Sequence, residues 1–172
     1  MESNLGSLDP KKPNQTSKVR IIGYGTFLWD VIKELAAGRR PKVWGEKIRV
    51  LGAIKVEGYR RLWPGKANYP VIQKAERYFF FGILFEIDED QLTRFDQIEG
   101  VPTLYIREII NVKFRGNTVS AFIYIPTDNM LRQALHEYEM TGIKPGYDDW
   151  ADHLRNTLSS EELRVFPEIF KN

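Results

Sequence analysis

The chain contains no cysteine and only two histidines, His136 and His153, among its 172 residues. Without cysteine there are no disulfide bonds, thiol nucleophiles or thiolate metal ligands, a composition typical of a reducing compartment. The two histidines have no other ligand residues at the spacing of a metal-binding motif, so we expect no metal site. A Gly-x-Ser-x-Gly segment, the nucleophile turn of many serine hydrolases, is also missing. The chemistry of this protein is therefore expected to come from other side chains.

A strong charge of one sign is missing too, because 25 basic and 23 acidic residues leave a formal net charge of +2. This balance gives no global field of the strength that nucleic-acid binding uses, so we expect no nucleic-acid partner. Local basic patches remain possible, and the only pairs of adjacent arginines are Arg39-Arg40 and Arg60-Arg61. We interpret both pairs as solvated surface rather than as phosphate contacts.

Long apolar runs are absent as well: none approaches the roughly 18 residues that cross a bilayer. The N-terminal residues lack the hydrophobic region of a signal peptide, so we expect a cytoplasmic protein without a membrane partner. Residues 1–17 are polar and aperiodic and predict a flexible tail. A hydrophobic content of 42% indicates a globular chain, and residues 18–172 are expected to form a single domain.

One segment, residues 21–28 with the sequence Ile-Ile-Gly-Tyr-Gly-Thr-Phe-Leu, combines three signals. The apolar run that ends at Ile22 predicts a buried strand, and Gly23 and Gly25 permit a tight turn with bare backbone amides. Apolar residues at helical spacing then predict a helix that starts with Thr26 as its N-cap and stops near Gly38. The free N–H groups of a first helical turn attract a carboxylate or a phosphate.

Four interpretations of this turn can be compared. A dinucleotide-binding loop needs a third glycine where Leu28 stands, and a Walker loop needs a Gly-Lys-Ser/Thr ending that the nearest candidate, Gly58 to Lys66, does not have. An ordinary strand-to-helix turn without a ligand remains an alternative. Among ligands, a small carboxylate is the better hypothesis.

A second informative segment is a short helix predicted between Asp88 and Gly100. Asp88 and Gln91 form a pair of the capping-box type, apolar residues recur on one face, and Gly100 would end the helix. Glu99 is then the last helical residue. A carboxylate there sits at the unfavourable, negative end of the helix dipole, so we consider it a candidate base. The alternative is a solvated residue at a helix end.

Strand patterns dominate the middle of the chain, at 47–56, 58–63, 69–74, 78–87, 105–114 and 118–126. Gly82 predicts a bulge or a sharp bend, and Arg115-Gly116-Asn117 predicts a hairpin connection. Helices are expected at about 129–139, 149–158 and 160–166. This order predicts an α+β fold with a curved, largely antiparallel or mixed sheet and a few helices.

The order and spacing of these motifs resemble the gamma-glutamylcyclotransferase-like (AIG2-like) family. The resemblance is carried by the Tyr-Gly-Thr-Phe-Leu loop after a strand, Gly82 within a hydrophobic strand, and Phe95-Asp96-x-x-Glu99-Gly100 followed by Tyr105-x-Arg107. More loosely, the segment Lys144-Pro145-Gly146-Tyr147 is similar to a C-terminal pocket segment of that family. The resemblance implies a small β-barrel flanked by helices.

The resemblance also implies a single pocket and its residues. Glu99 matches the acid/base glutamate, and Tyr24, Gly25, Thr26, Phe27 and Leu28 match the substrate loop. Tyr105 and Tyr147 are expected to line the same pocket, where Tyr59, Tyr69 and Tyr124 are further candidates. Arg107 would share the sheet face of Tyr105 and either pair with a carboxylate or face solvent.

The implied reaction closes a small γ-glutamyl amine or peptide to 5-oxoproline and releases the amine, with no metal or cofactor. One glutamate can act as base and then as acid, and partial burial would raise its pKa toward neutrality, where a base works best. The alternative is a non-catalytic protein that binds a small carboxylate metabolite in the same pocket. The expected partner is in either case a small molecule.

Overall fold

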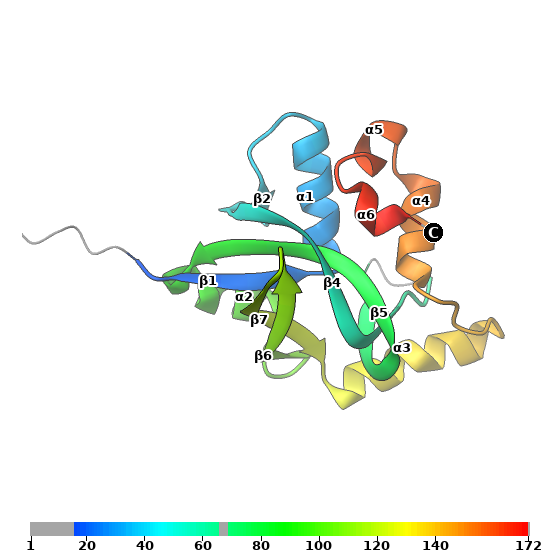
Figure 1. Ribbon diagram of the computed structural model, residues 1–172. Helices are drawn as coiled ribbons and strands as arrows, with labels where there is room; N and C mark the ends of the chain where they lie inside the picture. Colours follow the sequence, from blue (N-terminus) through cyan, green and yellow to red (C-terminus); the bar gives the residue numbers. More distant parts are fainter. Residues whose placement is uncertain (1–15, 66–68, 172) are drawn as a thin grey trace, which may run out of the picture.

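The computed structural model describes residues 16–65 and 69–171 and shows a curved sheet with helices packed against it (Figure 1). Most of the tail predicted for residues 1–17 lies outside the described residues. The five strands of the main sheet are β1 (Lys18–Gly23), β4 (Arg49–Leu62), β5 (Val71–Asp88), β6 (Tyr105–Phe114) and β7 (Asn117–Pro126). A separate short ladder joins β2 (Lys42–Val43) and β3 (Glu46–Lys47).

The described residues form six α-helices and one short 3-10 helix, and α6 has no counterpart in the sequence prediction. They are α1 (Thr26–Ala36), the short 3-10 helix η1 (Glu89–Gln91), α2 (Leu92–Glu99), α3 (Asp128–Thr141), α4 (Asp149–Thr157), α5 (Ser160–Leu163) and α6 (Pro167–Phe170). None of these helices is long and apolar enough to cross a membrane. The predicted α+β class is confirmed.

The main sheet has the strand order β4-β5-β1-β7-β6. Its neighbours are antiparallel except for β1 and β7, which run parallel with Ile21 opposite Phe122, so the sheet is mixed. The resemblance implied a closed barrel. Within the described residues, β4 and β6 are instead the two edges of an open sheet, and Arg115 at the end of β6 donates to the carbonyl oxygen of Leu51 on β4 at 3.1 Å. The sheet curls toward closure but does not reach it.

Two of the strands are longer than the sequence pattern indicates. The segments 47–56 and 58–63 merge into β4, and the segments 69–74 and 78–87 merge into β5. The register of β4 on β5 shifts between Glu57 and Tyr59, where Gly58 has a φ of +83°. Glycine adopts this conformation freely, so the strand continues through a bulge at the point where the sequence indicates a break.

Of the two possibilities predicted for Gly82, a bulge or a sharp bend, the bulge does not form. Pairing with β4 runs without a shift through Gly82, which lies opposite Ile54. The glycine is required for another reason: a Cβ atom there would lie 2.5 Å from the carbonyl oxygen of Gly23. The end of β1, where the loop to α1 starts, therefore packs directly on the backbone of β5.

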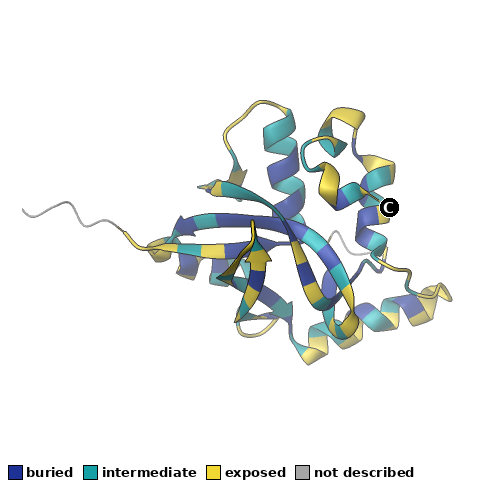
Figure 2. Ribbon diagram, viewed as in Figure 1, coloured by how far each residue is buried: buried dark blue, intermediate teal, exposed yellow. Residues whose placement is uncertain are grey.

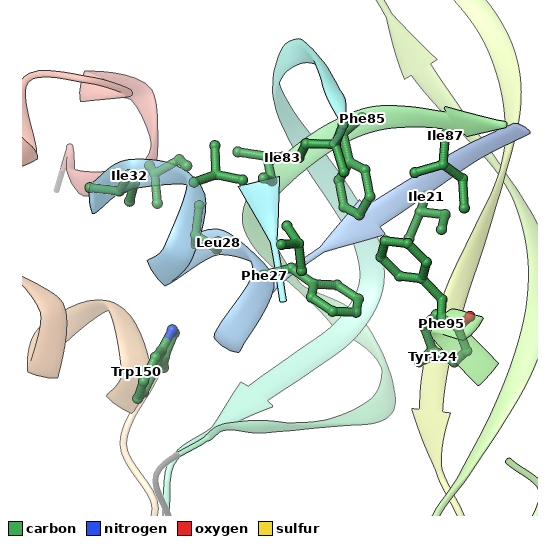
Figure 3. Close-up of a cluster of buried hydrophobic side chains, with 14 of the residues drawn as sticks. Ile21, Phe27, Leu28, Ile32, Ile83, Phe85, Ile87, Phe95, Tyr124 and Trp150 are labelled. Atoms are coloured by element: carbon green, nitrogen blue, oxygen red, sulfur yellow. The ribbon is translucent and has the colours of Figure 1, made fainter. Parts of the chain in front are cut away.

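Side chains of the central strands alternate between two buried clusters, as the period of a strand requires. Ile21, Ile83 and Phe85 face the helices and pack with Phe27 and Phe95 (Figure 3). Their neighbours in sequence, such as Ile22 and Leu84, face the inside of the curved sheet together with Ile54 and Ile123. The centre of the sheet is thus buried on both faces (Figure 2).

Candidate active site

The loop between β1 and α1 consists of Tyr24 and Gly25, and the helix begins at Thr26. The prediction of Thr26 as the N-cap is wrong by one residue, because Gly25 occupies that position and has no side chain to accept a hydrogen bond. The N–H groups of the first helical turn therefore receive no side-chain cap from this residue. They add to the positive end of the helix dipole at this point, an arrangement suited to an anion.

Gly25 is also fixed by close packing. A Cβ atom at this position would lie 2.7 Å from Cδ and 2.9 Å from Cγ of Pro70. The proline precedes β5, so the start of that strand presses directly on the loop. The loop has room for glycine alone unless Pro70 moves.

A cavity of about 200 Å³ opens beside this loop. The loop and the first turn of α1 form one wall, and the C-terminal end of α2 with the starts of β6 and α3 forms the opposite side. Its lining consists of Ile22, Tyr24, Gly25, Thr26, Phe27, Trp44, Tyr69, Pro70, Ile98, Glu99, Leu104, Tyr105, Tyr124 and Met130. Segments that are far apart in the sequence thus meet at one site.

Glu99 is the last residue of α2, and Gly100 ends the helix with a φ of +68°. Burial raises the pKa of Glu99 to about 7 from the ordinary 4.5. In the part of the chain that the structure describes, no side chain or backbone group donates a hydrogen bond to its carboxyl group or forms an ion pair with it. Glu99 thus combines the pKa of a base for neutral pH with a carboxyl group that is available to a ligand.

Asp96, one helical turn earlier, has a different environment. Its two carboxylate oxygens accept hydrogen bonds from Arg107 at 2.6 Å and from the Tyr124 hydroxyl at 2.8 Å. Arg107 also lies over the ring of Phe122, with its guanidinium carbon 4.8 Å from the ring centroid. Of the two outcomes considered for Arg107, the pairing with a carboxylate is the one that occurs. This group of side chains anchors α2 on β6 and β7.

Tyrosines line much of the cavity, and burial raises the pKa of Tyr24, Tyr105 and Tyr124. Burial, followed by the neighbouring Tyr105 hydroxyl and the Glu99 carboxylate, raises the pKa of Tyr24. Burial and the Glu99 carboxylate likewise raise the pKa of Tyr105. The Tyr24 hydroxyl donates to the carbonyl oxygen of Tyr124 at 2.5 Å. The site therefore pairs one titratable carboxyl group with phenol groups that keep their protons.

Arg61, a charged side chain that the sequence pattern assigned to the solvent-exposed surface, contacts the loop. Arg61 on β4 is only 1% exposed, so its interpretation as solvated surface is wrong. Its guanidinium donates to the carbonyl oxygen of Tyr24 at 2.9 Å and makes two hydrogen bonds, of 2.7 and 2.8 Å, to the Asp148 carboxylate. The neighbouring Arg60 donates to the carbonyl oxygens of Pro145 and Gly146.

Six of the predicted site residues line the cavity together, and two do not. Glu99, Tyr24, Gly25, Thr26, Phe27 and Tyr105 meet there, as do the further candidates Tyr69 and Tyr124. Leu28 points into the core and is fully buried, because the helix turns it away from the loop. Tyr147 lies beside a different cavity, next to Asp148 and the C-terminal helices, and its hydroxyl donates to the carbonyl oxygen of Phe79 at 2.9 Å.

Several lining residues were missed. Trp44 sits in the turn between β2 and β3, and its ring centroid lies 4.6 Å from that of Phe27. The sequence Trp44-Gly45 is a turn signal that could have drawn attention to it. Met130 lies in the first turn of α3, and no local pattern indicates that this turn faces the cavity. Only the packing of α3 against the sheet brings it there.

Among the described residues, no group of three or more His, Asp or Glu side chains is arranged to hold a metal ion. The groups that the site offers to a ligand are a carboxyl, phenols and backbone amides. This set can bind a small anion at the loop and exchange a proton at Glu99.

Several solved structures have a similar fold. An AIG2-like protein from Mus musculus has a TM-score of 0.50 at 21% identity, covering 66% of this chain and 82% of that one. A structure described as a gamma-glutamyl cyclotransferase has a TM-score of 0.51 at 12% identity, covering 88% and 99%. An uncharacterized protein from Homo sapiens has a TM-score of 0.50 at 12% identity, covering 86% and 97%. At these identities the similarity shows the fold alone.

No curated protein sequence matches the chain at a significant level. The sequence model of one family, described as gamma-glutamyl cyclotransferase, AIG2-like, matches residues 21–151. This match covers most of the chain and includes the loop, α2 and the strands that surround the cavity. The chain therefore belongs to the AIG2-like gamma-glutamyl cyclotransferase family.

Proposed function

We propose that this protein cyclises a small γ-glutamyl amine or peptide to 5-oxoproline and releases the amine, with Glu99 as the single acid/base group. The observation that carries the proposal is the environment of Glu99. Its carboxyl group, with a pKa raised to about 7, faces the same cavity as the uncapped start of α1. An anion site and a base are the two groups that this reaction needs.

Binding would begin with the α-carboxylate of the γ-glutamyl group. The backbone N–H groups of Gly25 and the first turn of α1 offer it hydrogen bonds and the positive end of the helix dipole. The phenol group of Tyr105 remains protonated and can donate to a substrate oxygen, whereas the Tyr24 hydroxyl donates to the carbonyl oxygen of Tyr124 and can only accept from the substrate. Holding both ends of the γ-glutamyl group favours the bent conformer in which its nitrogen approaches its own γ-carbonyl carbon.

Glu99, as a carboxylate, removes a proton from the α-ammonium group so that the nitrogen can attack the γ-carbonyl carbon and form the new C–N bond. The protonated Glu99 then donates to the departing nitrogen as the original amide bond breaks. In all, two protons leave the α-ammonium group and the released ammonium gains two, so the reaction consumes no external acid or base. Because nucleophile and electrophile belong to one molecule, an effective molarity of roughly 10⁵ to 10⁸ M is available from orientation alone.

The leaving amine has space next to the site. A second cavity of about 240 Å³ shares Tyr69 and Met130 with the first and extends along α3 to Ala134. We place the γ-glutamyl group in the first cavity and the amine toward the second. A panel of substrates that differ only in the size of the amine tests this placement.

The decisive experiment is mass-spectrometric detection of 5-oxoproline after incubation with γ-glutamyl amines, γ-glutamyl dipeptides and glutathione. Wild type, Glu99→Gln and the control Glu89→Gln, which changes an exposed carboxylate on η1, are compared. We expect product from wild type and Glu89→Gln and none above background from Glu99→Gln. If no substrate gives product and 5-oxoproline nevertheless binds to wild type, the protein is a binding protein and the catalytic proposal is wrong.

A further inference from the structure

Arg61 does not line the cavity, yet it contacts the loop that does. Its side chain has an exposed fraction of 0%, and its guanidinium carbon lies 5.1 Å from the centroid of the Phe80 ring. Burying an arginine in this way is unfavourable unless a counter-charge and hydrogen-bond acceptors compensate for the lost water, and each of the three guanidinium nitrogens of Arg61 has such a partner. Two of them bind Asp148, and a third binds the backbone oxygen of Tyr24 at 2.9 Å.

The bond to Tyr24 fixes the orientation of the peptide group between Tyr24 and Gly25. Among the described residues, the one cis peptide bond is Val101-Pro102, so the Tyr24-Gly25 peptide is trans. In a planar trans peptide, the C=O and N–H bonds point in opposite directions. Since the oxygen of Tyr24 points to Arg61, the N–H of Gly25 is held on the opposite side of the loop.

Asp148 in turn holds Arg61. It is the N-cap of α4, has a φ of +51°, and its Oδ1 atom accepts from the N–H of Ala151 at 3.3 Å as well as from Arg61. Its side chain is only 13% exposed. The start of α4, the buried guanidinium and the loop at the cavity thus form one continuous chain of hydrogen bonds.

We propose that Arg61, oriented by Asp148, is a positioning residue that holds the Tyr24-Gly25 peptide so that the N–H of Gly25 binds the α-carboxylate of the γ-glutamyl substrate. This role rests on the proposed function. It means that Arg61 and Asp148, which lie outside the cavity, contribute to substrate binding. Without Arg61, the peptide group is free to rotate, and its carbonyl oxygen can turn toward the carboxylate and repel it. The loss is expected in substrate binding, while the acid/base step at Glu99 is unchanged.

The test uses the double variant Arg61→Met/Asp148→Leu, which removes both charges together and leaves no buried ion without a partner. We expect a folded protein with about tenfold weaker 5-oxoproline binding and about tenfold higher KM, a change of about 1.4 kcal/mol. The kcat and its pH dependence should stay within about twofold of wild type. Arg61→Lys, which keeps a cation opposite Asp148 and an N–H donor for the Tyr24 oxygen, serves as the conservative variant and should retain most of the affinity.

The direct readout is the amide signal of Gly25 in a ¹H–¹⁵N spectrum during titration with 5-oxoproline. It should move in wild type and in Arg61→Lys, and barely in the double variant. Arg60→Met is the matched control, since Arg60 binds the Pro145 and Gly146 oxygens of the segment before α4 and not the loop. If the folded double variant binds 5-oxoproline with wild-type affinity, the positioning role of Arg61 is wrong, and the proposed function is unaffected. Absence of both binding and turnover in wild type overturns the proposed function and this role with it.

Discussion

Asp96 and Glu99 lie one turn apart on α2, and their carboxyl groups differ in whether neighbouring side chains donate hydrogen bonds to them. Asp96 accepts from Arg107 and Tyr124 and is held in place, whereas burial raises the pKa of Glu99 to about 7 and no described residue bonds to its carboxyl group. A carboxylate that is fully bonded supports the structure. A carboxyl group that is buried next to a cavity without such bonds is available for proton transfer.

The first prediction concerns the pH dependence of the reaction. Glu99 must be ionised to remove the first proton, so kcat/KM should rise tenfold per pH unit below about 7 and reach a plateau above it. Steady-state rates measured from about pH 5 to 9 provide the profile. If the rate instead rises around pH 4.5, the ordinary pKa of a glutamate, then either burial does not raise the pKa of Glu99 or a different group sets the rate.

The second prediction is that Glu99→Gln stabilises the protein while removing its activity. Since the folded-state pKa of about 7 lies above the ordinary 4.5, the folded state binds the proton more tightly than the unfolded state does. Protonation of Glu99 stabilises the folded state. This stabilisation is complete below about pH 4.5, and it is lost as the pH rises through about 7. At about pH 8, Glu99→Gln should therefore be more stable than wild type by up to about 3 kcal/mol.

The check is chemical denaturation of both proteins at about pH 4 and pH 8. The two unfolding free energies should agree within about 0.5 kcal/mol at the lower pH and separate at the higher one. Equal stabilities at pH 8 would mean that burial does not disfavour the Glu99 carboxylate. Glu89→Gln, at an exposed position, should follow wild type at both values.

The third prediction separates the structural role of Asp96 from the catalytic role proposed for Glu99. Asp96→Asn weakens the bonds from Arg107 and Tyr124, and since Arg107 is about one-third exposed (29%), we expect a loss of about 1–2 kcal/mol. Activity should fall far less than in Glu99→Gln, with the same pH profile. Combining Asp96→Asn with Arg107→Met should cost less than the sum of the single variants, because they remove one shared interaction.

The fourth prediction tests the packing of the loop. In Gly25→Ala, the new methyl group would lie 2.7 Å from Cδ of Pro70, so either the loop or the start of β5 must move. We expect a loss of about 1–3 kcal/mol in stability and a higher KM. Pro70→Ala removes the ring atoms responsible, so Gly25→Ala/Pro70→Ala should recover much of both. Failure of the double variant to recover would assign the requirement for glycine to the backbone conformation instead.

Much of the fold follows from local patterns. The helix-ending role of Gly100, the hairpin around Gly116 and the succession of strands and helices are all set by neighbours in the sequence, through turn geometry and side-chain periodicity. The pairing of Asp88 with Gln91, whose side chain accepts from the Asp88 N–H at 2.9 Å, is an interaction of this local kind. The position of Glu99 at the end of a helix was predictable for the same reason.

The sequence alone thus determined the class of the fold and the local positions of the loop at Tyr24-Gly25 and of Glu99 at the end of a helix. The tertiary structure decided which residues share a surface: it brought Pro70 against Gly25, buried Arg61 under the loop, and directed Tyr147 to another cavity. Local patterns specify conformation over a few residues, whereas burial and contact between distant segments depend on how the strands pair and curve. A pair of adjacent arginines looks the same in the sequence whether it meets water or a buried aspartate, and only the packing of α4 against β4 separates the two.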